Sequence, residues 1–266
     1  MVLRAKEQGR LRLHHRFCSR YLSTPRDLVV YLPPGYETGR TRYPVFYLQD
    51  GQNLFDPATA FGGNDWRADI TADDLIGRGR IEPLIMVGIY NTGVRRVSEY
   101  TPTRDPGSRK GGKAARYAQM LAREIKPFID REYRTRKSAG DTAAGGSSLG
   151  ALVSLVAGIG YPRVFGKLAL LSPSVWWDRR SILPLIDSWK APRRPRIWLD
   201  VGTQEGSDPA KVVADARLMR DALDAQGADL RYCEAAGHGH NEQAWGARFG
   251  GVLEYLFPPT PAAPRI

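Results

Sequence analysis

The chain has only two cysteines among 266 residues, Cys18 and Cys233. They are too few and too far apart for a disulfide framework or a cysteine-rich metal site, so we expect two free thiols. No apolar run reaches the 18 residues of a membrane-spanning helix, and residues 1–16 lack the apolar core of a signal peptide. These absences favour a cytoplasmic location without a membrane partner.

The net charge is strongly positive, with 39 Lys and Arg against 28 Asp and Glu, a balance of +11. A nucleic-acid-binding protein needs its basic residues gathered on one face or in one short run. Here they are scattered along the whole chain, which favours a solvated surface and argues against a nucleic-acid partner. A basic rim facing the substrate, near Arg95, Arg96 and Arg104, is the alternative.

Short apolar runs alternate with helical patterns along most of the chain. The strands that we expect are Leu11–Phe17, Leu28–Leu32, Val45–Leu48, Leu84–Tyr90, Thr142–Gly146, Leu168–Leu171, Ile197–Val201 and Leu230–Glu234. Several of these runs are almost wholly apolar, which is typical of strands covered on both faces of a mostly parallel sheet. The first two runs alternate more and indicate an antiparallel hairpin at one edge.

Four helices are expected between and after these strands, at Lys113–Tyr133, Leu149–Ile159, Ala210–Gln226 and Glu242–Leu256. Pro127 lies inside the first and should kink it or mark a break. Alternating strands and helices predict an α/β fold in one domain, residues 1–257, with a sheet of about eight strands and helices on both faces. Residues 258–266 form a Pro-rich tail, and no long insertion indicates a large lid.

A serine motif occupies one strand-to-helix junction, Gly146-x-Ser148-x-Gly150. A serine on such a sharp turn projects its hydroxyl over the sheet edge, and small neighbours are needed to tolerate the strained backbone. The alternative is a phosphate-binding turn, but neither Gly-Lys-Ser/Thr nor G-x-G-x-x-G is present in this segment. Ser148 is therefore the expected nucleophile.

A serine hydroxyl needs a base, and the base needs an orienting acid, in the chain order Ser, Asp or Glu, His. Only His238 and His240 follow Ser148, both in a loop after an expected strand. We find no third ligand that would make this histidine pair a metal site. The acid is expected after the strand Ile197–Val201, where Glu205 is nearer the strand end than Asp208.

Two backbone N–H groups are needed to stabilise an oxyanion. One is expected from Leu149, directly after the nucleophile. The other is expected from Gln52, in the loop where Gly51 permits an unusual turn.

Several segments together resemble one esterase family, which contains enterochelin-type siderophore esterases, feruloyl and acetyl xylan esterases, S-formylglutathione hydrolase and mycolyltransferases. The resemblance runs from about Asp27 to Phe257. The segments that carry it are Tyr47–Asp56, Val87–Asn91, Glu99–Pro102, Ile129–Thr135, Gly145–Gly150, Ser172–Trp177 and His240-Asn241-Glu242-x-x-Trp245.

This resemblance implies an α/β-hydrolase fold and ester hydrolysis without a metal or organic cofactor. Members place a tryptophan five residues after the catalytic histidine, which selects His240 because of Trp245. The loop Gly202–Glu205 resembles the loop that carries the family's acid, although glutamate replaces the more usual aspartate. Candidates for contact with the substrate are Asn53, Phe55, Trp66, Asn91, Trp176 and Trp177.

The sequence thus predicts a serine carboxylic ester hydrolase that acts on small acyl, aryl, sugar or siderophore esters through a Ser148–His240–Glu205 triad. Two alternatives remain open. One is an acyltransferase that uses the same acyl-enzyme, and the other is a non-catalytic binding domain of the same fold.

Overall fold

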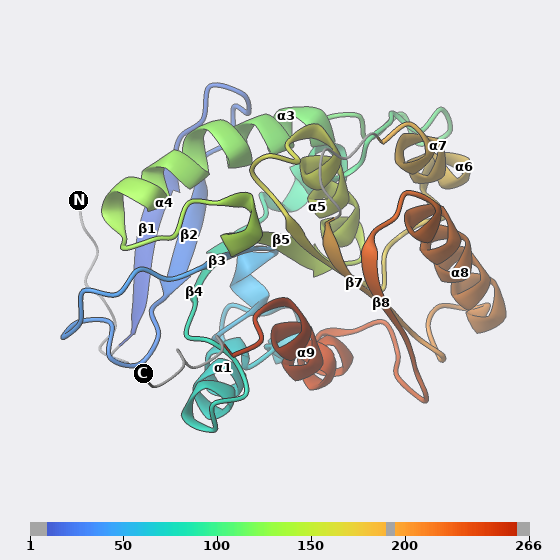
Figure 1. Cartoon of the computed structure of the whole chain (residues 1–266). Coiled ribbons are helices and arrows are strands. Elements are labelled where there is room, and N and C mark those ends of the chain that lie inside the picture. The colour runs from blue at the N-terminus through green and yellow to red at the C-terminus, as the bar shows by residue number, and fades with distance from the viewer. Residues whose placement is uncertain (1–9, 190–194, 260–266) are drawn as a thin grey trace.

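A single eight-stranded sheet forms the centre of the protein (Figure 1). The computed structural model describes residues 10–189 and 195–259. The sheet order is β1-β2-β4-β3-β5-β6-β7-β8, and β2 is antiparallel to both of its neighbours, whereas all pairs from β4 to β8 are parallel. The strands are β1 (Leu11–Phe17), β2 (Arg26–Tyr31), β3 (Val45–Gln49), β4 (Ile85–Ile89), β5 (Thr142–Ser147), β6 (Lys167–Leu171), β7 (Arg196–Gly202) and β8 (Asp229–Ala235).

Each of the eight expected strands is present, with ends within two residues of the expected ones. The mostly parallel sheet and the antiparallel edge hairpin are both confirmed. The apolar runs were informative because the central strands are covered on both faces. In β3, Val45 and Tyr47 face one hydrophobic core, and Phe46 and Leu48 face the other.

Helices cover both faces of the sheet (Figure 1). One core is formed with α3, α4, α5, α7 and α8, and the other with α1 and α9. Their bounds are α1 (Ala68–Gly77), α2 (Arg96–Tyr100), α3 (Ala114–Met120), α4 (Lys126–Glu132), α5 (Leu149–Gly160), α6 (Trp177–Arg180), α7 (Ile182–Asp187), α8 (Pro209–Ala225) and α9 (Glu242–Leu256). The sequence patterns missed α1, α2, α6 and α7.

The helix expected over Lys113–Tyr133 is divided by a π-helical segment, η4 (Leu121–Ile125), between α3 and α4. The backbone stays helical at Met120, Leu121, Ile125 and Lys126, so the helix is not broken before Pro127. The disturbance expected at the proline takes the form of a π-helical turn just before it.

Both cysteines are free thiols, as expected. Within the described ranges, no helix has the length and apolar character that crossing a membrane requires. The expected tail, residues 258–266, falls almost entirely outside the described residues. Because β5 lies between β3 and β6 in the middle of the sheet, the turn that follows it reaches the centre of the carboxyl edge.

Candidate active site

Ser148 occupies the sharp turn between β5 and α5, with φ 58° and ψ −122°. This backbone region is rarely adopted by a residue with a side chain and marks local strain. A Cβ at Gly146 would lie 3.0 Å from the Cβ of Gln49, and one at Gly150 would lie 3.1 Å from the same atom. The two glycines therefore let strand, turn and helix pack closely enough to hold Ser148 at the sheet edge.

His240 follows β8 and reaches Ser148 from the neighbouring loop. Its Nε2 lies 3.0 Å from Ser148 Oγ. The imidazole packs edge-on against Trp245, with ring centroids 4.9 Å apart. Asn241 caps α9 by accepting the N–H of Ala244 at 2.9 Å, which fixes the residue after the histidine. Of the two histidines considered from the sequence, the structure brings His240 to the serine.

Glu205 lies on the other side of the imidazole, where its Oε2 is 2.8 Å from His240 Nδ1. Its Oε1 accepts the Gly202 N–H at 2.6 Å and the hydroxyl of Ser172. Burial would raise the pKa of Glu205, which is only 1% exposed, but hydrogen bonds from His240, Ser172 and Gly202 outweigh it and lower that pKa below its ordinary value. The carboxyl group is therefore held as an anion.

Asp208, the other acid considered from the sequence, is the N-cap residue of α8. Its carboxylate accepts the Lys211 N–H at 3.1 Å and caps α8. The structure thus brings Glu205 to the histidine and leaves Asp208 at the helix end.

The loops that carry Glu205 and His240 are packed back to back. A Cβ at Gly202 would lie only 2.2 Å from the carbonyl oxygen of His238, which also accepts the Gln204 N–H at 3.0 Å. Gly237 N–H donates to Thr203 Oγ1 at 2.9 Å. This contact fixes the acid and the imidazole relative to each other.

A buried polar network behind Glu205 was missed by sequence reasoning. The Ser172 hydroxyl accepts from Trp245 Nε1 and from Arg248 Nη2, each at 2.8 Å. Arg248 Nη2 also donates to Asp200 at 2.9 Å and lies 3.8 Å from Glu205 Oε1. Burial raises the pKa of Asp200 even though Arg248 opposes that shift. The sequence did carry a signal for this network: Asp200 stands in the apolar strand β7, and Arg248 stands on the apolar face of α9.

The loop expected to supply an oxyanion donor lies against the Ser148 turn. Asp50 has a left-handed backbone, φ 57°, and its Oδ2 is 3.2 Å from where a Cβ on Gly150 would be. A Cβ at Gly51 would lie 2.3 Å from the Gly88 carbonyl carbon, so only glycine fits there. Leu149 begins α5, where a first-turn N–H has no partner within the helix. The oxyanion roles of Leu149 and Gln52 remain predictions.

Arg96, from the basic rim considered above, is bound in an ion pair. Its Nε and Nη2 donate to the two oxygens of Asp50, each at 2.7 Å, and Asn91 Nδ2 donates to Asp50 at 2.8 Å. Both Arg96 and Asn91 therefore brace the loop before Gln52, whose Oε1 accepts the Asn91 N–H at 3.2 Å.

The other candidates for substrate contact divide into buried and exposed groups. The side-chain amide of Asn53 already has partners, because its Nδ2 donates to Glu242 at 3.0 Å and its Oδ1 accepts the Phe61 N–H. Phe55 stacks on Tyr31 at a centroid distance of 6.4 Å.

Among the three tryptophans, Trp66 and Trp177 are 3% and 7% exposed, whereas Trp176 is 58% exposed. Trp176 helps to line a cavity of about 410 Å³ with Val97, Asp105, Ser108, Lys110, Trp177, Asp178 and Arg179. Of these candidates, Trp176 alone combines a large aromatic surface with broad exposure.

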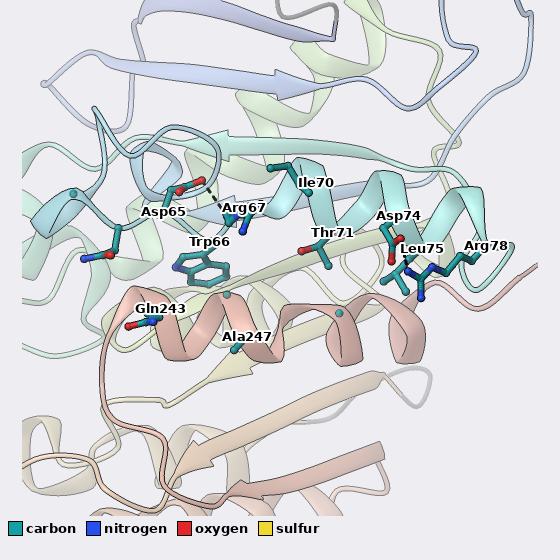
Figure 2. Close-up of a pocket in the computed structure, with 14 residues that line it drawn as sticks. Asp65, Trp66, Arg67, Ile70, Thr71, Asp74, Leu75, Arg78, Gln243 and Ala247 are labelled. Atoms are coloured by element: carbon teal, nitrogen blue, oxygen red, sulfur yellow. Dashed lines mark hydrogen bonds and ion pairs between the residues drawn. The ribbon is translucent and has the colours of Figure 1, made fainter.

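A larger cavity, of about 680 Å³, lies between α1 and α9 (Figure 2). At one end of the cavity, Trp66 precedes α1 and lies against the first turns of α9, where Gln243, three residues after His240, is also found (Figure 2). The lining does not include Ser148, His240 or Glu205. This cavity is therefore distinct from the cluster around the serine.

Comparison with known proteins gives sequence relatives and solved structures that cover most of the chain. YbbA, an uncharacterized protein of Bacillus subtilis, is 25% identical over 87% of this chain and 92% of its own. The ferri-bacillibactin esterase BesA of the same organism is 26% identical over 74% of this chain and 73% of its own. The crystal structure of the BES protein from Bacillus cereus superposes with a TM-score of 0.77, 21% identity, and coverage of 96% of this chain and 97% of that one. The last similarity establishes the fold alone.

A family model described as "Putative esterase" matches residues 19–256 of the 266. It spans all the strands from β2 to β8 and the loops that carry Ser148, Glu205 and His240. The resemblance noted from the sequence motifs is therefore confirmed, and the chain belongs to this esterase family.

Proposed function

We propose that this esterase hydrolyses carboxylic esters with Ser148 as nucleophile, His240 as general base and Glu205 as the orienting acid. The observation that carries the proposal is the continuous chain of hydrogen bonds from Ser148 Oγ to His240 Nε2, at 3.0 Å, and from His240 Nδ1 to Glu205 Oε2, at 2.8 Å. This is the order of roles that serine hydrolysis requires.

Proton positions follow from the partners of Glu205. A carboxylate can only accept hydrogen bonds, so the proton of neutral His240 resides on Nδ1 and leaves Nε2 free. Nε2 then takes the hydroxyl proton while Ser148 Oγ attacks the ester carbonyl carbon. The imidazolium returns that proton to the departing alkoxide, and an alcohol leaves.

The acyl-enzyme is then hydrolysed by the same groups. His240 takes a proton from water, the hydroxide attacks the acyl carbon, and Ser148 Oγ leaves with the proton that His240 returns. In both halves the N–H groups of Leu149 and Gln52 are proposed to donate to the oxyanion. Each such donor typically contributes about 3–4 kcal/mol to the transition state.

The substrate is proposed to be a small ester whose acyl or aryl part lies against Trp176. Trp176 lies two residues after Ser174, whose Oγ is 3.0 Å from Ser148 Oγ, and its exposed indole supports an aromatic or siderophore ester more than a simple acetyl ester. The name of the relative BesA points the same way. A screen over acetyl, butyryl, feruloyl and siderophore trilactone esters tests this, and an aromatic or trilactone ester is expected to give the highest kcat/KM.

The central test is Ser148→Ala, assayed with p-nitrophenyl acetate. Loss of the nucleophile is expected to lower turnover by about 10⁴–10⁶-fold. An organophosphonate probe should label wild-type protein at Ser148 and leave the variant unlabelled. Thermal melts of both proteins control for folding. Full hydrolysis by a folded Ser148→Ala variant would remove the proposal, and an unlabelled wild type would instead favour a non-catalytic binding domain.

An added alcohol separates hydrolysis from acyl transfer, because both begin with the same acyl-enzyme. With p-nitrophenyl acetate and an added sugar or other alcohol acceptor, free acetic acid is expected as the main product. A predominance of the acetylated acceptor would assign the chain as an acyltransferase instead.

A further inference from the structure

A second serine hydroxyl touches the proposed nucleophile. Ser174 Oγ lies 3.0 Å from Ser148 Oγ, and the Ser174 N–H donates to the Ser148 carbonyl at 3.3 Å. Ser174 is 2% exposed, so water does not compete freely for its hydroxyl. The mechanism above leaves this contact without a role.

The direction of the hydroxyl–hydroxyl bond can be assigned by counting protons. Ser148 has one hydroxyl proton, and that proton points at His240 Nε2 when the imidazole is neutral. Ser148 Oγ can then only accept from Ser174. We infer that Ser174 is a hydrogen-bond donor to the nucleophile and a further catalytic residue of this esterase, an inference that rests on the proposed function.

This donor acts where charge develops. As His240 removes the Ser148 proton, electron density grows on Oγ, and the Ser174 hydroxyl stabilises it without giving up its own proton. The same bond helps Oγ to leave when the deacylation intermediate collapses. One contact should therefore lower the barriers of both half-reactions while leaving substrate binding unchanged.

The segment that carries Ser174 is held in place at both ends. Ser172 begins it in a left-handed conformation, φ 44°, with its hydroxyl bound to Glu205. Trp177 N–H donates to the Ser174 carbonyl at 3.1 Å. The segment thus contacts the acid through one serine and the nucleophile through the next, which accounts for its fixed geometry beside the triad.

The test compares Ser174→Thr with Ser174→Val, because the two side chains have nearly the same shape and only threonine keeps a hydroxyl. With p-nitrophenyl acetate, Ser174→Val is expected to lose about 10-fold in both kcat and kcat/KM relative to Ser174→Thr, with KM unchanged. The rate of labelling by an organophosphonate with a p-nitrophenoxide leaving group should fall by a similar factor.

Ser154→Ala is the matched control. Ser154 is a buried serine of α5, and its hydroxyl donates to the carbonyl of Gly150, one turn earlier in the helix, at 2.8 Å. This variant should keep wild-type rate constants within about 2-fold. Ser174→Ala serves as a second hydroxyl-free variant if the valine side chain prevents folding.

Equal rate constants for folded Ser174→Thr and Ser174→Val would overturn the assignment, as would an unchanged Ser174→Ala. A change in KM alone would also overturn it, because it would place Ser174 in substrate binding. Labelling of the wild type at Ser148 separates these outcomes from a failure of the proposed function. If the wild type labels and the Ser174 variants label equally fast, only the role of Ser174 is lost.

Discussion

Replacing Glu205 by glutamine should impair hydrolysis more than its near-identical shape suggests. Glu205 Oε1 accepts two buried hydrogen bonds, from Gly202 N–H and from Ser172 Oγ, and Oε2 accepts from His240 Nδ1. A glutamine must keep its oxygen toward the two donors. Its amide NH₂ then faces Nδ1, which forces the imidazole proton onto Nε2. In that tautomer His240 cannot take the proton of Ser148.

The magnitude follows from the cost of turning the amide round. That orientation restores the useful tautomer but places NH₂ against Gly202 N–H and against the hydroxyl of Ser172. Ser172 cannot turn away without loss, because its oxygen already accepts from Trp245 and Arg248. Two buried donors lose their acceptor, at about 1–3 kcal/mol each. The population with the amide turned round and the imidazole proton on Nδ1, which is the active state, is thereby lowered between about 30-fold and 10⁴-fold.

The assay is kcat/KM for p-nitrophenyl acetate at pH 7.5, with Glu205→Gln, Glu205→Ala and Asp208→Asn measured together. Alanine removes the acid without imposing a tautomer, so Glu205→Ala should retain more activity than Glu205→Gln. Asp208→Asn should match the wild type, because Asp208 only caps α8. The reasoning is refuted if Glu205→Gln, shown to be folded by its thermal melt, is within 10-fold of wild type or exceeds Glu205→Ala.

Two further perturbations test other parts of the molecule. Trp176→Ala should lower kcat/KM for a feruloyl ester by about 3–10-fold, since an aromatic contact is worth about 0.5–1.5 kcal/mol. The kcat/KM for p-nitrophenyl acetate should stay within about 2-fold of wild type. Equal losses of kcat/KM on both esters would contradict a role of Trp176 in specificity. Burial lowers the pKa of Lys167 to about 8 from the ordinary 10.5, so the folded state disfavours the charged amine and stability should rise as pH increases from about 8 to 10.5. Lys167 lies at the amino end of β6, and Lys167→Met should lose the rise in stability with pH and be about 1–3 kcal/mol more stable at pH 7. Urea unfolding at several pH values across this range measures both effects. If the free energy of unfolding of the variant still rose with pH as in the wild type, Lys167 would not be the source of the rise.

The parts of the fold that the sequence predicted are those fixed by local physics. Central strands are apolar on both faces, so their runs are visible without tertiary information. The turn at Ser148 was predictable because a strained serine between strand and helix needs glycines two residues before and after it. Helix α1 was missed because it buries only two small residues, Ala68 and Ala72, and shows no strong apolar stripe.

The candidate site was predicted in outline and missed in its surroundings. Chain order selects a serine, an acid and a histidine, but spacing alone left Asp208 open as the acid. Ser172 follows β6, whereas Asp200 is in β7 and Arg248 is in α9, and the three meet because β6 and β7 are adjacent and α9 packs across them. Partners of that kind depend on strand order and helix placement, which no local pattern reports.

The missed residues set the charge balance on which the proposed chemistry depends. Asp200, Glu205 and Arg248 are all buried, and Arg248 bonds to Asp200 at 2.9 Å while lying 3.8 Å from Glu205. When Asp200 and Glu205 are both ionised, Arg248 balances one of the two negative charges, and the cluster keeps a net charge of −1. That remaining charge resides on Glu205, beside Nδ1 of His240. When His240 takes the proton of Ser148, the buried cluster and the imidazolium together become neutral, so the charge that forms in the transition state has a counter-charge already in place. Without Arg248, the negative charges of Asp200 and Glu205 would repel each other and favour protonation of one of the two carboxylates.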